Sequence, residues 1–373
     1  MTNLENAAGT ARAKEPQHFF EKQLAGEQPL SFETAQQLHY LALTLQVGQP
    51  WEYLDDGEFI LLRDPESGEL CYCSVLGGLG MVFAIHAYIG EESYRFMRRV
   101  RRGKDIAPAD FFGTLRAVMV EYVLAPERKL PDRELLAAFG RPAKQRGHAP
   151  IFRAIRPGYH PWYLTEKEGK LLAHCLRGVL ALCKMEPPKG GDFWDQVDVF
   201  PLLTPKQDDP TCGDYNLDLV HAPEPPSSRL QAVAIDEARI NDIQQRLFLQ
   251  RGFLEADHFF ALAEIGGKNE RKACMSAAAV CDGDSGHAFQ PELGRPGEPA
   301  GDLLVRAILG AIQNNRIVPR EIRVRKQGFK FMLHGLSEGL GIEVRAKKLL
   351  PMLDPFRREL LAHLGDPGEF PVE

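Results

Sequence analysis

The strongest helical pattern along the chain begins after Thr165. Apolar residues recur there at spacings of three and four, at Leu172, Cys175, Leu176, Val179, Leu180 and Cys183. Polar residues occupy the opposite side of the same turns, at Lys170, His174, Arg177 and Lys184. This spacing predicts an amphipathic helix with one buried face. Thr165 and Glu168 have the spacing of a capping box, in which a hydroxyl and a carboxylate bind free backbone amides at a helix start.

An aromatic segment with two prolines, Arg156-Pro157-Gly158-Tyr159-His160-Pro161-Trp162, precedes this helix. Each proline fixes its own φ and favours an extended residue before it, so we expect a rigid turn. Such a turn presents the rings of Tyr159 and Trp162 at low entropic cost, and we predict that both are buried between the two halves of an N-terminal unit. The turn and the helix are expected to join this unit to a C-terminal one.

Before this turn, the pattern predicts a helix, a β-meander and further short elements. Turn-forming residues at 65–68 (Pro-Glu-Ser-Gly) and 77–80 (Gly-Gly-Leu-Gly) separate the first three strands. The expected helices span 31–48, 91–102 and 132–139, and the expected strands span 59–63, 70–76, 81–89 and 115–124. The helix at 91–102 ends in a strongly basic turn. The N-terminal part is therefore predicted to be an α+β domain built on a meander.

The C-terminal part is predicted to be an α/β domain with a mixed sheet. The expected strands span 258–265, 273–281, 287–291, 322–325 and 342–345, and the expected helices span 236–250, the turns from Leu304 to Ile312, 329–338 and 350–364. Three antiparallel strands followed by the order αβαβα resemble the element order of ribonuclease-H-like domains. Successive strand–helix–strand units form right-handed parallel crossovers, which places the last two strands parallel to each other.

The domain organisation follows from where the pattern is lost. Residues 1–30 are polar and predicted to be a disordered arm. The N-terminal domain is expected at 31–185 and the C-terminal domain at 229–373. Residues 186–228 are dense in proline and predicted to be mostly linker, with one short strand at 197–200.

Composition narrows the class of protein. The 373 residues carry a formal net charge of -6, which argues against a protein that coats nucleic acid without specificity. The chain contains no apolar run of the roughly 20 residues that span a bilayer. Its start lacks the apolar core of a signal peptide, so we expect a cytoplasmic protein without membrane association. Seven cysteines, an odd number, argue against a disulfide framework. We also expect no cofactor.

Part of the chain resembles a family of uncharacterised bacterial proteins. The resemblance rests on Trp51, the Cys-Tyr-Cys strand at 71–73 and above all the turn at 156–162, and residues 319–364 resemble a companion domain of the same group. Proteins of this group are known only for domains of unknown function. The resemblance implies a bacterial origin and a two-part architecture, and it implies no activity, cofactor or site.

One set of residues is a candidate for a metal site. If residues 77–80 form a four-residue hairpin loop, Cys71 lies opposite His86, and Cys73 shares their face. Three ligands would then converge, although structural and catalytic zinc sites need three or four fixed ligands. The alternative is an apolar core with two small thiols and a hydrogen-bonded histidine. We favour that alternative and predict that no metal is held.

An active ribonuclease-H-type enzyme would need carboxylates that converge for two-metal chemistry. Asp257 or Glu264 could supply a carboxylate from the first strand. Glu298 or Asp302 could supply one from the first helix. The fourth strand, however, ends in Arg325-Lys326-Gln327 without an acid. This departure favours a non-catalytic protein over a metal-dependent phosphodiesterase.

The functional prediction is an anion site at one edge of the C-terminal sheet. The last two strands end in cations, and ligands of open α/β sheets gather outside such carboxyl ends. The predicted anion-binding residues are Arg325, Lys326, Arg345, Lys347 and Lys348. The expected ligand is phosphate-bearing or acidic, with nucleic acid as one possibility.

We therefore expect a non-catalytic binding or regulatory protein. The first alternative is a divalent-metal-dependent phosphodiesterase, and the second is a structural protein that docks partners on the exposed face of the meander. The oligomeric state stays open.

Overall fold

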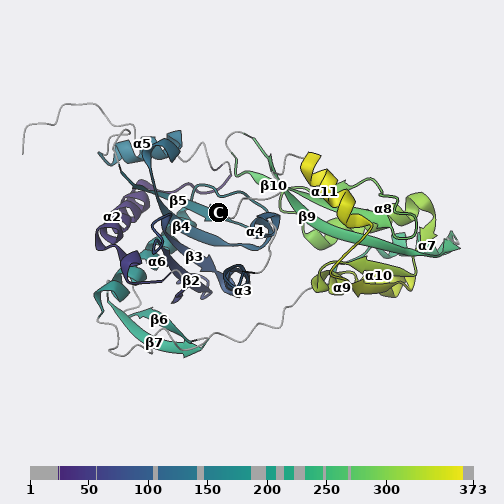
Figure 1. The fold of residues 1–373 in the computed structure, drawn as a ribbon, viewed down its shortest axis with the longest axis horizontal. Coiled ribbons are helices and arrows are strands. Elements are labelled where there is room, and N and C mark those ends of the chain that lie inside the picture. Colours follow the sequence, from purple (N-terminus) through teal and green to yellow (C-terminus); the bar gives the residue numbers. More distant parts are fainter. Residues whose placement is uncertain are drawn as a thin grey trace, which may run out of the picture.

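The structure is a computed structural model. It describes residue 24 and residues 26–55, 57–103, 108–140, 147–185, 199–206, 214–221, 232–246, 249–267 and 270–363. Two sheets with their own helices form two units, one N-terminal and one C-terminal (Figure 1). The expected fold class, α+β followed by α/β, is confirmed.

The N-terminal unit is built on a seven-stranded sheet with the order β5-β4-β3-β2-β1-β6-β7. Strands β1 to β5 form an antiparallel meander, and β6 joins it by pairing parallel to β1. The strands are β1 (Ile60–Arg63), β2 (Leu70–Leu76), β3 (Phe83–Ile89), β4 (Ala117–Val123), β5 (Ala149–Ile155), β6 (Val199–Pro205) and β7 (Tyr215–His221).

Helices cover both faces of this sheet. They are α2 (Phe32–Gly48), α3 (Gly90–Arg101), α4 (Pro108–Thr114), α5 (Leu130–Ala138) and α6 (Glu166–Lys184), with 3-10 turns η1 (Pro50–Glu52) and η2 (Ala125–Glu127). The apolar face of α6 packs with α2 on one side of the sheet, and α3 packs Tyr94 and Phe96 on the other. The predicted capping box is present, because Thr165 accepts from the backbone of Glu168 and Glu168 accepts from that of Thr165.

The C-terminal unit has a five-stranded sheet with the order β11-β10-β9-β13-β14. Its strands are β9 (Phe253–Ile265), β10 (Ala273–Asp282), β11 (Glu292–Leu293), β13 (Glu321–Val324) and β14 (Glu343–Ala346), and a separate pair consists of β8 (Leu249–Gln250) and β12 (Ile317–Val318). Its helices are α7 (Glu237–Gln245), α8 (Ala300–Asn315), α9 (Gln327–Met332), α10 (His334–Leu340) and α11 (Leu353–His363). Strands β9 to β11 are antiparallel and β13 and β14 are parallel to each other, as predicted, and β13 also pairs parallel to β9. Helix α8 covers one face of the sheet and α11 the other.

Two strands lie inside the segment that was predicted to be a linker. Strand β6 pairs with β1 at Leu202 and Leu203, and β7 pairs along β6 as the edge of the sheet. Pro201 and Pro205 lie within β6, and proline usually marks an edge strand or none. The expected strand at 197–200 overlaps only the first two residues of β6, and pairing with β1 stabilises the part that the sequence pattern did not predict. The other parts of the expected linker, residues 186–198, 207–213 and 222–228, lie outside the described residues.

Other sequence expectations are also corrected. Strand β5 was missed, the expected strand at 287–291 is only a bridge between Ala288 and Cys281, and the expected helix at 329–338 is two helices that meet at Leu333. The expected N-terminal arm is not free over its last residues, because Leu24 and Leu30 are 3% and 2% exposed and belong to the core. Residues 1–23 lie outside the described residues.

The aromatic turn at 156–162 connects the two units. The oxygen of Gly158 accepts from the backbone N–H of Cys274 (2.8 Å), and the N–H of His160 donates to the oxygen of Lys272 (2.9 Å). Tyr159 and Trp162 are half-buried, and Trp162 packs against the core of the N-terminal unit. The two rings are thus less buried than predicted. The prolines shape the turn, and the backbone of Gly158 and His160 forms hydrogen bonds with residues at the start of β10.

A close approach of α4 to β9 completes this interface. Gly113 lies so near the ring of Phe260 that a Cβ atom there would stand 2.6 Å from Cε2. The backbone of Gly113 has no positive φ, so the requirement for glycine is purely steric. Strand β9 and helix α4 therefore fit together at Phe260 only without a side chain at position 113.

We predict that Gly113→Ala lowers the free energy of unfolding by about 1–3 kcal/mol, because the interface is overpacked. Urea denaturation measures this difference. Gly48→Ala is the matched control, since a Cβ atom at Gly48 meets nothing within 4 Å. Equal stability of the two variants would contradict the packing described.

Candidate functional site

Helix α3 places a set of arginines on the surface of the N-terminal unit. Its first turn carries Glu91 and Glu92, and its last turn carries Arg98, Arg99 and Arg101. This distribution of charge complements the helix dipole and stabilises the helix. The buried rings of Tyr94 and Phe96 hold the helix on the sheet. The arginines are thereby presented on a fixed support.

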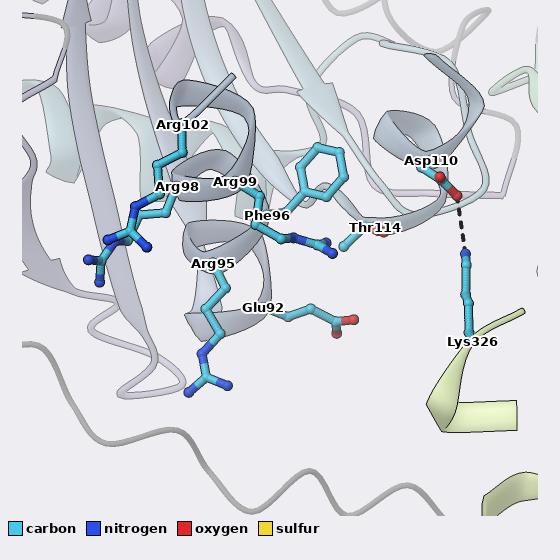
Figure 2. Close-up of a pocket in the computed structure, with 9 residues that line it drawn as sticks. All are labelled: Glu92, Arg95, Phe96, Arg98, Arg99, Arg102, Asp110, Thr114 and Lys326. Carbon is cyan, nitrogen blue, oxygen red and sulfur yellow. Dashed lines mark hydrogen bonds and ion pairs between the residues drawn. The ribbon is translucent and has the colours of Figure 1, made fainter. Parts of the chain in front are cut away.

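A cleft of about 700 Å³ lies between this helix and the C-terminal unit (Figure 2). Its cations are Arg95, Arg98, Arg99, Arg102 and Lys326, and its carboxylates are Glu92 and Asp110. Phe96 and Thr114 complete the lining. Among the described residues that line it, five cations and two carboxylates leave three net positive charges, in a chain whose overall charge is -6. We call this the basic cleft.

The arginines of the basic cleft differ in how far they are engaged. Arg95 donates to Glu91 (3.0 Å), and Arg98 and Arg99 lie 5.7 and 5.5 Å from the ring centres of Tyr94 and Phe96. Arg99 and Arg102 are exposed, and neither forms an ion pair within the described part of the chain. In Figure 2, Arg98 and Arg102 lie beside each other, and Arg99 extends toward Thr114.

Lys326 brings the C-terminal unit into the basic cleft. It precedes α9, and its Nζ lies 3.1 Å from Oδ1 of Asp110 at the start of α4. Their side chains are 49% and 38% exposed, and such pairs contribute only about 0–1 kcal/mol. An added anion can therefore compete with Asp110 for Lys326.

The other residues of the predicted anion edge do not enter the basic cleft. Arg325 bonds Asp257 and Asp354, and Arg345 bonds Glu343 (2.6 Å). Lys347 and Lys348 are exposed. The start of α11, which follows this edge in the chain, is already capped, because the buried carboxylate of Glu255 accepts from the N–H groups of Met352 (2.8 Å) and Leu353 (3.0 Å).

Asp257 is the acid of the first C-terminal strand, and it is engaged in ion pairs. It is 1% exposed, with Arg325 at 2.8 Å and Arg357 at 3.6 Å. Burial raises the pKa of Asp257, while the hydrogen bond from Arg325 acts to lower it. Next to it, burial lowers the pKa of His258 to about 4, and the Nε2 of its ring lies 3.0 Å from the hydroxyl of Ser276.

The remaining carboxylates considered for metal chemistry lie apart from this cluster. Glu264 and Asp302 are exposed, and Glu298 bonds Arg306. Among the described residues, no three His, Cys, Asp or Glu side chains are grouped so that they could hold a metal ion. The position where the fourth strand would supply an acid carries Arg325, which neutralises Asp257 instead.

The register of β2 and β3 separates the candidate zinc ligands. The loop between these strands has six residues, and Ser74 lies opposite His86, while Cys71 lies opposite Ile89. Because side chains alternate between faces, this odd shift from the expected register moves His86 to the other face. The hydrogen bond with Cys175, together with burial, raises the pKa of Cys71. The geometry that the sequence suggested for Cys71, Cys73 and His86 was therefore wrong.

The α3 arginines were not recognised as site residues from the sequence. Their spacing, at positions 95, 98, 99 and 102, was the available signal, because residues three and four apart share one helix surface. The sequence alone did not say that Lys326 would face them.

Comparison with known proteins yields two family matches. Residues 36–188 match the model of a family described as Domain of unknown function (DUF7309), and residues 239–361 match one described as Domain of unknown function (DUF6930). No curated protein and no solved structure matches the chain. In the part of the chain that is described, no helix has the length and apolar character to cross a membrane. The chain thus combines two segments similar to domains of unknown function, and α3 of the first and Lys326 of the second line one cleft.

Proposed function

We propose that this protein is a non-catalytic binding or regulatory protein that works in the cytoplasm and holds a phosphate-bearing ligand in the basic cleft. The observation that carries the proposal is the gathering of five cations from two units around one cavity (Figure 2). Two of them, Arg99 and Arg102, lack an ion-pair partner among the described residues. Guanidinium groups bind phosphate oxygens through paired hydrogen bonds, so this residue type suits that ligand.

The charge balance of the cleft supports a ligand with several negative charges. An anion that binds here neutralises like charges that otherwise repel one another across the cavity. Engagement of Lys326 together with the α3 arginines would connect the two units through the ligand. A regulatory role follows from that connection, because binding would strengthen the contact between the units.

The proposal predicts salt-sensitive binding that depends on α3. A short fluorescein-labelled DNA duplex and inorganic tripolyphosphate serve as two phosphate sources, measured by anisotropy and by calorimetry. We expect wild type to bind the duplex, tripolyphosphate or both, and we expect the double variant Arg99→Glu, Arg102→Glu to abolish that binding. For the duplex, the slope of log K against log salt is negative. A single replacement of one of these arginines by alanine should reduce the magnitude of that slope by about 0.9 for the lost phosphate contact.

The double variant Lys347→Glu, Lys348→Glu is the matched control, because it reverses the same number of charges on the exposed part of the predicted edge. Binding that is lost in this control and kept in the α3 variant would place the ligand at the sheet edge and contradict the cleft. Failure of wild type to bind either source at low salt would reject the function.

A further inference from the structure

The tip of the β2–β3 hairpin forms a second surface, which is apolar, unlike the basic cleft. Large apolar side chains are exposed there together: Leu79 is 80% exposed, Met81 75% and Val82 55%, and Tyr53 beside them is 55% exposed. Single exposed apolar residues are common, whereas a contiguous group indicates an interaction site. Methionine and tyrosine are also enriched in protein interfaces.

These side chains border a groove of about 980 Å³. Its deeper wall contains Trp51 and Phe83, whose ring centres lie 4.9 Å apart. The hairpin tip is held firmly against this wall, because a Cβ atom on Gly77 would stand 2.7 Å from Cβ of Trp51. The N–H of Gly80 donates to the oxygen of Gly77 (2.9 Å) and closes the turn. The apolar surface is therefore preorganised, which reduces the entropy lost when a partner binds.

The charge of the groove restricts its partner. Glu52, Asp55 and Glu58 lie along it, and the described residues that line it include no lysine, arginine or histidine. Asp55 and Glu58 are fixed by a turn in which the N–H of Asp55 donates to Glu58 (2.9 Å). An apolar strip beside a row of carboxylates is complementary to a helix with one apolar and one basic face.

We propose that this groove docks a basic amphipathic helix of a partner protein. Such a helix places its apolar anchors at spacings of three, four and seven residues into the groove, and its cations meet the carboxylates. A membrane surface fits less well, because anionic headgroups repel Glu52, Asp55 and Glu58. A second copy that met the groove with its own groove across a twofold axis would oppose like charges.

The test uses full-length protein and a labelled synthetic helix with leucines on one face and lysines on the other. We expect it to bind wild type and to bind the double variant Leu79→Asp, Met81→Asp at least about tenfold more weakly. The matched control is Leu293→Asp, Leu349→Asp, which replaces leucines that are 55% and 72% exposed in the C-terminal unit and should leave binding unchanged. Glu52→Lys should weaken binding of the lysine helix and strengthen that of an otherwise identical glutamate helix.

Three results would overturn the proposal. The first is equal binding of the lysine helix to wild type and to the hairpin variant. The second is that wild type and the control variant float with phosphatidylcholine–phosphatidylserine vesicles while the hairpin variant does not, which would assign the surface to a membrane. The third is concentration-dependent dimerisation in sedimentation that the hairpin variant abolishes, which would assign it to a second copy. Thermal unfolding verifies that each variant is folded, and Met81→Asp alone replaces the double variant if the latter is not.

Discussion

Replacing Glu168 with alanine is expected to lower the free energy of unfolding by about 3–5 kcal/mol, because it leaves a buried cation without its main partner. Glu168 accepts from Arg156 (2.7 Å) and from Arg271 (3.3 Å), and Arg271 is only 5% exposed. Arg271 comes from the C-terminal unit and enters the N-terminal one, so this network also holds the two units together. Glu27, at 3.5 Å from Arg271, is the remaining carboxylate of the network.

The size of this loss depends on pH. Burial acts to raise the pKa of Glu168, but the hydrogen bond from Arg156 and the charge of Arg271 outweigh it, and the net shift is downward from 4.5. A lowered pKa means that the ionised carboxylate stabilises the folded state above the unfolded pKa. The difference between wild type and Glu168→Ala should therefore be full at neutral pH and shrink as the pH falls below about 4.5.

Chemical denaturation of both proteins at several pH values measures this difference. Glu66→Ala is the control, since its pair with Lys167 (2.9 Å) is 52% and 62% exposed and should contribute less than about 1 kcal/mol. Glu168→Gln separates the two roles of the residue, because the amide keeps an acceptor for the cap at Thr165 and removes the charge. A loss as small as that of the control would show that the network does not stabilise the fold.

Replacing Arg325 with leucine is expected to cost a similar amount, about 3–5 kcal/mol at neutral pH. The variant leaves Asp257, which is 1% exposed, with Arg357 at 3.6 Å as its remaining cation. Burial already raises the pKa of Asp257 in the wild-type protein, and loss of the hydrogen bond from Arg325 should raise it further. A raised pKa favours the protonated folded state, so the variant should regain stability relative to wild type as the pH falls through the pKa of Asp257.

The companion variant Asp257→Asn removes the stranded charge while its amide oxygen can still accept from the N–H of His258. We expect Arg325→Leu combined with Asp257→Asn to be more stable than Arg325→Leu alone at neutral pH, a coupling that a double-mutant cycle measures. Arg345→Leu is the control, because its pair with Glu343 is exposed. Additive losses in the cycle would contradict the ion pair.

The two networks also bear on the basic cleft. Arg271 and Phe260 fix the C-terminal unit against the N-terminal one, and Lys326 follows directly after Arg325. The wall that carries Lys326 is therefore held at its place opposite α3 by contacts outside the cleft. Loss of Glu168 should weaken ligand binding indirectly, through the contact that places Lys326, whereas loss of Arg99 should remove a ligand contact itself.

Elements with strong local periodicity were predictable from the sequence. The helix α6 and its capping box depend on residues within one or two turns of each other, and they were found at their expected positions. The parallel direction of β13 and β14 was also predictable, because strand–helix–strand connectivity restricts the direction in which two neighbouring strands pair. The basic last turn of α3 was visible for the same reason.

Features that depend on distant residues were not predictable. The six-residue loop of the β2–β3 hairpin set the register and moved His86 away from Cys71 and Cys73, because one odd shift reverses every side chain. Strand β6 contains two prolines and is stabilised by pairing with β1, about 140 positions earlier, so the local pattern predicted only its first residues, within 197–200.

The sequence by itself determined the helices with strong local periodicity, such as α6, and it showed two units and cations that gather near Arg98 and Lys326. Only the tertiary structure decided which of these cations are free. Arg325 and Lys326 are neighbours in the chain just after β13, yet one pairs with the buried Asp257 and the other lines the basic cleft. Burial and ion pairing depend on what the fold brings within a few ångströms, and residues more than 200 positions apart supply it here.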